Sequence, residues 1–214
     1  MKRVLLVCAL GLVAGAVALP AMASGNGWSV AVDAGQSMYS KSDFNIAASP
    51  GWATKYSTHP TAYRLLVAYK FNDYLGIEGG YVDLGQAKAD MTCTTGCTIP
   101  DRGTYLDTRA DAKGWQLDGV VDYPFADHWM VFGRLGVIDA KVNYTVQSNA
   151  FAMGTTMHAS DTSVKPTFGV GVGWSVTDNL GVRFSWDRYQ SLGSTSSTGK
   201  YGVNLVSVGA QYTF

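Results

Sequence analysis

The chain has 214 residues with 16 basic and 16 acidic side chains, and no strongly basic run, so we expect no nucleic-acid partner. After residue 23, no apolar stretch is long enough for a membrane-spanning helix. If the chain enters a membrane, it must do so as a closed β-barrel, because only helices and barrels satisfy every backbone polar group in lipid.

The first residues, 1–23, have the features of a secretory signal peptide and are excluded from the fold. Lys2 and Arg3 make a positive start, an apolar run follows, and a small-x-small cleavage sequence ends at Ala23. Cleavage near Ala23 leaves residues 24–214, which is enough for one barrel domain. Loss of the two basic residues changes the formal net charge to about −2.

From residue 27 onward, the sequence repeats one unit: a strand, a very short turn, a second strand and a long polar loop. Apolar residues alternate with small or polar ones at the two-residue period of a β-strand. Each strand has about ten residues, the length that crosses a bilayer at a tilt. The pattern predicts an all-β fold, an eight-stranded antiparallel up-and-down transmembrane β-barrel. The predicted strands are 27–38, 61–71, 74–84, 113–125, 129–142, 164–176, 180–189 and 200–214.

The connections alternate in length, as in bacterial barrels with a periplasmic and an outer side. The short turns are 72–73, 126–128 and 177–179. The predicted long loops are 39–60, 85–112, 143–163 and 190–199. Aromatic residues gather near both ends of the strands, which predicts two girdles at the membrane interfaces. A lipocalin-type soluble barrel would turn its apolar face inward, and periodicity alone permits this, but the signal peptide, the terminal Phe214 and the paired girdles favour a transmembrane barrel.

The face opposite the apolar one carries acidic and basic residues at similar depths in the predicted lumen. A lone charge there would be costly, whereas paired and hydrogen-bonded charges are tolerated. We therefore expect an interior charge network, with Glu78 and Arg134 at its centre, that cross-links the strands and closes the lumen. The lumen of an eight-stranded barrel is wide enough only for its own side chains. The predicted network consists of Asp33, Arg64, Glu78, Asp118, Asp122, Arg134, Arg183 and Asp187.

Two cysteines remain after signal cleavage, Cys93 and Cys97, in a polar stretch. In an oxidising cell envelope, a local disulfide between them is the favoured interpretation, with Gly96 easing the tight turn. A metal site is the alternative, but two thiolates without a nearby histidine support it weakly.

Catalysis on such a barrel would need a His-Ser or His-Asp constellation at the outer strand ends. His128 lies in a short turn, and His59 and His158 lie in loops close to serines, which is ordinary for polar loops. There is no phosphate-binding loop and no metal-ligand cluster in the sequence. We therefore expect no enzymatic activity, no cofactor and no metal.

The last strand runs to the end of the chain, with an apolar face and a small or polar face. Ser207, Gly209, Tyr212 and Phe214 resemble the polar, glycine and paired aromatic positions in the terminal strand of bacterial outer-membrane barrels. Over the mature chain, the sequence resembles the small eight-stranded barrels of the OmpA-transmembrane and OmpX type. Two further segments carry this resemblance, 78–81 at the end of the third strand and 132–136 in the core of the fifth.

The resemblance implies a location in the bacterial outer membrane and recognition of the terminal strand by the barrel-assembly machinery. It also implies that the interior network can act as a gate. No peptidoglycan-binding domain follows the barrel, so we do not expect that anchoring role. We expect a structural scaffold whose outer loops contact lipopolysaccharide, host molecules or neighbouring proteins. The alternative is a narrow, gated pore for ions or small solutes, which uncompensated like charges in the lumen would have favoured.

Overall fold

The computed structural model describes residues 27–39, 52–94, 105–148, 155–193 and 201–214, and the predicted signal peptide lies outside them. In this part of the chain, no helix is long and apolar enough to cross a membrane. The strands are β1 (Gly27–Tyr39), β2 (Trp52–Ser57), β3 (Thr61–Lys70), β4 (Leu75–Cys93), β5 (Tyr105–Ala126), β6 (Trp129–Ser148), β7 (Thr155–Ser175), β8 (Leu180–Leu192) and β9 (Tyr201–Thr213).

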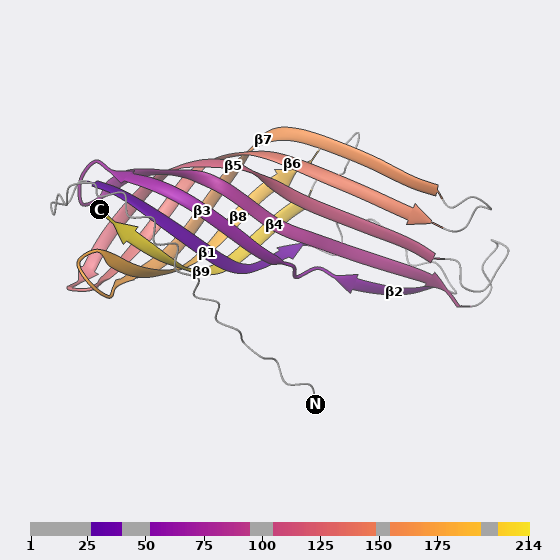
Figure 1. The fold of residues 1–214 in the computed structure, drawn as a ribbon, viewed down its shortest axis with the longest axis horizontal. Coiled ribbons are helices and arrows are strands. Elements are labelled where there is room, and N and C mark those ends of the chain that lie inside the picture. The colour runs from indigo at the N-terminus through magenta and orange to yellow at the C-terminus, as the bar shows by residue number, and fades with distance from the viewer. Residues whose placement is uncertain (1–26, 40–51, 95–104, 149–154, 194–200) are drawn as a thin grey trace, which may run out of the picture.

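Eight of these strands close into a ring in which all neighbours are antiparallel (Figure 1). The order around the ring is β1, β3, β4, β5, β6, β7, β8 and β9, and β9 pairs with β1. That last pairing joins Ser29 to Thr213 at one end and Tyr39 to Val203 at the other. The closure confirms the predicted eight-stranded antiparallel up-and-down barrel.

The ninth strand, β2, lies outside the ring. Within the described residues it pairs with the outer part of β4, from Trp52 opposite Cys93 to Ser57 opposite Lys88. The prediction of 39–60 as a loop was therefore wrong for this segment. Its pairing depends on β4 being longer than the alternating pattern indicates.

Four consecutive strands, β4 to β7, run past their predicted ends and project beyond the rest of the barrel (Figure 1). β4 and β5 stay paired out to Thr92 and Tyr105, and β6 and β7 stay paired over a similar length. The predicted loops 85–112 and 143–163 are therefore largely strand, and those loop boundaries were wrong.

A β-bulge in β4 explains why the alternating pattern ends too early. The register with β5 shifts between Asp83 and Gln86, where Gly85 adopts a left-handed φ of 73°. Before the bulge the buried positions are even-numbered, as at Val82, and after it they are odd-numbered, as at Ala87. The buried face beyond the bulge is rich in alanine, which has little strand propensity, so the sequence signal there is weak.

The two faces of the ring have the orientation of a membrane barrel. On the outward face, Leu65, Leu117 and Leu135 are 59%, 58% and 71% exposed, whereas the charged residues predicted for the interior are buried. Near the short turns, Trp129 and Trp174 stack with their ring centroids 6.1 Å apart, as expected for an interface girdle. An apolar outer surface of this kind matches the hydrocarbon core of a bilayer.

Candidate functional site

Six charged residues converge inside the barrel, in the half of the lumen nearer the short turns. Each side chain reaches the lumen because it occupies an inward position in the two-residue alternation of its strand. Each residue is at most 5% exposed. The six are Asp33 on β1, Arg64 on β3, Glu78 on β4, Arg134 on β6, and Arg183 and Asp187 on β8.

Together these residues form a closed ring of ion pairs in which arginines and carboxylates alternate. Each guanidinium bridges two carboxylates, and each carboxylate bridges two guanidinium groups. The ring carries no formal net charge, so the burial of each ion is compensated by two opposite charges. Around the ring the order is Asp33, Arg183, Glu78, Arg134, Asp187, Arg64 and back to Asp33.

Two of the arginines are richly hydrogen-bonded. Arg183 donates from Nε and Nη2 to the two carboxylate oxygens of Asp33, at 2.8 and 2.7 Å, and from Nη1 to Glu78. This bidentate geometry is the strong form of an arginine–carboxylate pair. Arg64 donates from Nη1 to Asp187 at 2.7 Å, and its Nη2 donates to two serine hydroxyls, each at 2.8 Å. The two hydroxyls belong to Ser185 and Ser207.

Arg134 has fewer partners. Its Nη1 donates to Glu78 Oε1 at 2.8 Å, and its Nε lies 3.3 Å from Asp187 Oδ1 without hydrogen-bonding geometry. Its Nη2 is buried and has no hydrogen-bond partner among the described residues. The guanidinium carbon lies 5.0 Å from the ring centroid of Phe132, close enough for a cation–π contact. Arg134 is therefore the weakest corner of the ring.

Glycines make space for three of the interior carboxylates. A Cβ atom at Gly209 would overlap Asp33 Oδ1, and one at Gly169 would overlap Asp187 Oδ1. In the same way, a Cβ atom at Gly136 would overlap a carboxylate oxygen of Asp118. A larger residue at any of these positions would displace the acid.

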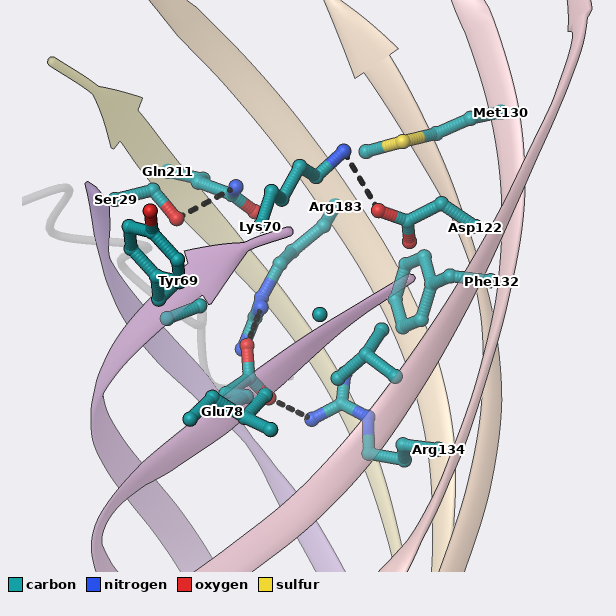
Figure 2. A pocket seen from close by; sticks show the side chains of 14 residues that line it. Ser29, Tyr69, Lys70, Glu78, Asp122, Met130, Phe132, Arg134, Arg183 and Gln211 are labelled. Carbon is teal, nitrogen blue, oxygen red and sulfur yellow. Dashed lines mark hydrogen bonds and ion pairs between the residues drawn. The ribbon is translucent and has the colours of Figure 1, made fainter. Parts of the chain in front are cut away.

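A small cavity separates the ring from the periplasmic end of the lumen (Figure 2). Its volume is about 30 Å³, enough for one or two water molecules but not for a solute. At its mouth, Lys70 Nζ lies 2.6 Å from Asp122 Oδ2, and the Lys70 side chain is 28% exposed. Asp122 therefore belongs to a separate ion pair at the periplasmic mouth, and sequence reasoning did not name Lys70 as its partner.

The remaining predicted network residue, Asp118, lies outside the ring. It accepts hydrogen bonds from Gln116 Nε2 and from Thr167 Oγ1, the latter at 2.7 Å. Gln116 in turn accepts a hydrogen bond from the Tyr189 hydroxyl at 2.9 Å. Both hydrogen-bond donors to Asp118 among the described residues are neutral groups, and Gln116 connects Asp118 to Tyr189.

An apolar layer fills the outer half of the lumen, above the charge ring, and sequence reasoning missed it. Leu84 follows Glu78 along β4, Ile138 follows Arg134 along β6, and Leu205 precedes Ser207 on β9. In the sequence, these residues occupy the same inward-facing positions of the alternation as the charged residues, and this pattern could have revealed the layer. The residues of this apolar layer that are fully or almost fully buried include Val82, Leu84, Ile138, Val142, Tyr189, Leu192, Val203 and Leu205.

The predicted assembly-signal residues divide between the two faces of β9. Ser207 is buried and bonded to Arg64, and Gly209 makes room for Asp33. Tyr212 is 46% exposed, and its ring meets that of Phe214 edge-on at 5.2 Å, near the short turns. Ser207 and Gly209 thus have packing roles in the lumen that are independent of any recognition during assembly.

The cysteine pair lies at the outer end of β4. Cys93 is disulfide-bonded. Cys97 lies outside the described residues, so its pairing with Cys93 stays a prediction. Among the described residues, no group of three His, Cys, Asp or Glu side chains could hold a metal ion.

Comparisons with known proteins agree with this geometry. The family described as OmpA-like transmembrane domain matches residues 23–214. Outer membrane protein A of Serratia marcescens is 28% identical over 224 residues, which cover all of this chain and 56% of that protein. That of Klebsiella pneumoniae is 29% identical over 151 residues, covering 68% of this chain and 39% of that protein. The chain thus spans about half the length of these relatives or less.

Solved structures show the same fold. Ail, the attachment invasion locus protein of Yersinia pestis, has a TM-score of 0.53 and 16% identity, covering 89% of this chain and all of that one. OprG from Pseudomonas aeruginosa also has a TM-score of 0.53, with 14% identity, covering 91% and 99% of the two chains. Because the family match covers the whole barrel, the chain belongs to the OmpA-like transmembrane domains of the bacterial outer membrane.

Proposed function

We propose that this barrel is a closed, non-conducting scaffold that holds its extended strands at the outer surface for contacts with other molecules. The observation that supports this most is the ring of six ion pairs beneath the apolar layer, because the two layers together fill the lumen. The ring also ties five strands across the lumen, which makes the barrel rigid. Residues 1–23, as a cleaved signal peptide, remain part of this proposal.

The alternative, a gated pore for ions or small solutes, has less support. Exchange of ion-pair partners in the ring would open a path only through the polar half of the lumen. The apolar layer would still stand above it, and a dry apolar constriction blocks ions by excluding water. Opening the charge ring alone is therefore insufficient for conduction.

The outward face of the strand extension supports a role in surface contacts. Lys88 lies opposite Arg109 on the neighbouring strand, and in the next row on the outward face Asp90 lies opposite Asp107. Rows of opposite sign therefore alternate, and Arg109 forms an ion pair with Asp107 at 2.5 Å. The solved Ail complex contains the heparin analogue sucrose octasulfate. For this chain, the mixture of signs favours a partner that presents both charges over a polyanion.

Two further roles belong to the proposal, contact with lipopolysaccharide and recognition of the terminal strand during assembly. Lys113 and Lys141 lie opposite each other one row beyond Trp115, where their exposed ammonium groups would meet lipopolysaccharide phosphates. Recognition of the terminal strand by the assembly machinery would have to precede closure, because both edges of β9 are paired in the barrel. No catalysis is proposed: the rings of His59 and His158 each lie within hydrogen-bond distance of a threonine hydroxyl, but among the described residues no carboxylate hydrogen-bonds to either ring to orient it as a base.

Single-channel recording tests the closed scaffold. The mature chain and Glu78→Ala would each be refolded into planar lipid bilayers, with insertion verified by heat-modifiable migration on gels. We expect no conductance from either protein. Conductance that rises on removal of Glu78 would overturn the proposal and make the ring the gate of a pore.

A further inference from the structure

A groove of about 620 Å³ crosses the lipid-facing side of the barrel over β5 to β8. It lies outside the lumen, and the proposed scaffold role makes no use of it. Its lining is apolar or aromatic, and its polar side-chain groups are the Tyr123 hydroxyl and the Trp186 indole N–H. The outward-facing residues that bound it include Val121, Tyr123, Val131, Val170, Phe184 and Trp186.

The groove is hollow because β6 carries a glycine at its centre. Gly133 pairs with Val121 on β5 and with Val170 on β7. A Cβ atom at Gly133 would meet no atom within 4 Å, whereas a Cβ atom at the inward-facing Gly136 would overlap the backbone of β5. Interior packing therefore does not require glycine at 133, and its effect is to leave space on the outside.

The depth of the groove identifies its surroundings. Trp129, at the periplasmic girdle, is four residues before Gly133 on β6. At about 3.3 Å per residue and a tilt of about 40°, Gly133 lies about 10 Å inside the girdle, within the hydrocarbon region. Its neighbour Leu135 is 71% exposed on the same face. The groove is therefore continuous with the belt that faces lipid.

We propose that the groove binds an acyl chain of an inner-leaflet phospholipid. An unfilled hollow would lose dispersion contacts along its walls, and acyl chains are the apolar groups that already surround it. A second copy of the barrel would gain no hydrophobic advantage over lipid, because lipid tails are as apolar as the lining. Contacts between proteins in membranes are stabilised by hydrogen bonds, and this lining offers few groups that can form them. Lipid is therefore the occupant that fits the site.

Quenching of Trp186 fluorescence by phospholipids brominated in mid-chain tests this site, because Trp186 lines the groove. Subtracting the spectrum of Trp186→Phe from that of the full chain isolates the Trp186 signal in refolded proteoliposomes. Gly133→Leu fills the groove, and Gly133→Ala is a milder filling should the leucine variant not refold. Gly119→Leu is the matched control: this outward-facing glycine on β5 lies outside the groove, and the nearest atom to its added Cβ is 3.8 Å away.

We expect Trp186 to reach half-maximal quenching at a brominated-lipid fraction at least twofold lower in the wild-type chain than in Gly133→Leu. Gly133→Ala should lie between them, and Gly119→Leu should match the wild type. Identical curves for the wild type and both Gly133 variants would overturn the proposal. So would weak Trp186 quenching in the wild type together with crosslinked dimers that Gly133→Leu abolishes, since the groove would then hold a second copy.

Discussion

Gly209 and Asp33 face each other across the seam between the last and first strands, and the glycine leaves the space that the carboxylate occupies. A methyl group at 209 would overlap Asp33 Oδ1 and press against the backbone of Val32. Asp33 holds both Arg183 and Arg64, so this one contact couples barrel closure to the charge ring.

Gly209→Ala should therefore lower the free energy of unfolding by about 1–3 kcal/mol, the usual cost of overpacking. Denaturant titration of the chain refolded in lipid, followed by tryptophan fluorescence, measures this loss. Gly181→Ala near the start of β8 is the control, because this glycine also faces inward but its added Cβ would meet the nearest atom, the Trp174 carbonyl oxygen, only at 3.4 Å. Equal stability of the two variants would contradict a packing role for Gly209.

Glu78→Gln keeps the shape of the side chain but removes a charge shared by Arg134 and Arg183. Two buried guanidinium groups would each lose one of two partners, so we expect a loss of about 3–5 kcal/mol in unfolding free energy. A double-mutant cycle with Arg134→Met should give a coupling energy of about 0.5–3 kcal/mol. Additive effects would contradict a direct interaction between Glu78 and Arg134.

Lys70→Met tests whether depth decides the strength of an ion pair in this lumen. Lys70 and Asp122 lie as close as the pairs of the ring, but the lysine side chain is 28% exposed at the periplasmic mouth. Water can replace the lysine only in part, because the Asp122 side chain is 7% exposed, so we expect a loss of about 1–3 kcal/mol, smaller than that of Glu78→Gln. Stability curves at low and high salt provide the measurement. A loss as large as that of Glu78→Gln would mean that the mouth is as dry as the ring.

The apolar layer should control conduction. Leu84→Ser combined with Ile138→Ser places hydroxyl groups in the layer, and we expect a small conductance only when Glu78→Gln is added, because both barriers are then weakened. Bilayer recordings of the double and triple variants make the comparison, with refolding verified for each. Conductance from Glu78→Gln alone would place the barrier in the ring.

The inward positions of the charged residues follow from sequence, because strand alternation is a local property. Their partners do not, because the contact between Arg64 and Asp187 joins residues 123 positions apart through the register and tilt of several strands. Sequence reasoning placed Glu78 with Arg134, and the structure shows this contact as one of six in a closed cycle. The cycle itself could not be read from the spacing of the residues.

The apolar layer and the strand extension could likewise be predicted only in part from the sequence. Leu84 and Ile138 carry the correct parity, but parity does not say whether an inward position faces water, a charge or another leucine. Beyond Gly85 the bulge reverses the parity, and alanines replace the larger residues that mark a strand. Cross-strand pairing with β5 supplies the hydrogen bonds that keep this segment extended.

By itself, the sequence determined the number of strands in the ring, their up-and-down order and the face that meets lipid. These properties depend on the two-residue period, the lengths of the connections and the apolar belt, all of which are local along the chain. Only the tertiary structure decided which charges pair, that an apolar layer seals the outer half of the lumen, and that Gly133 opens a groove toward lipid. These features depend on the register and curvature of the closed barrel, which bring distant residues to one level.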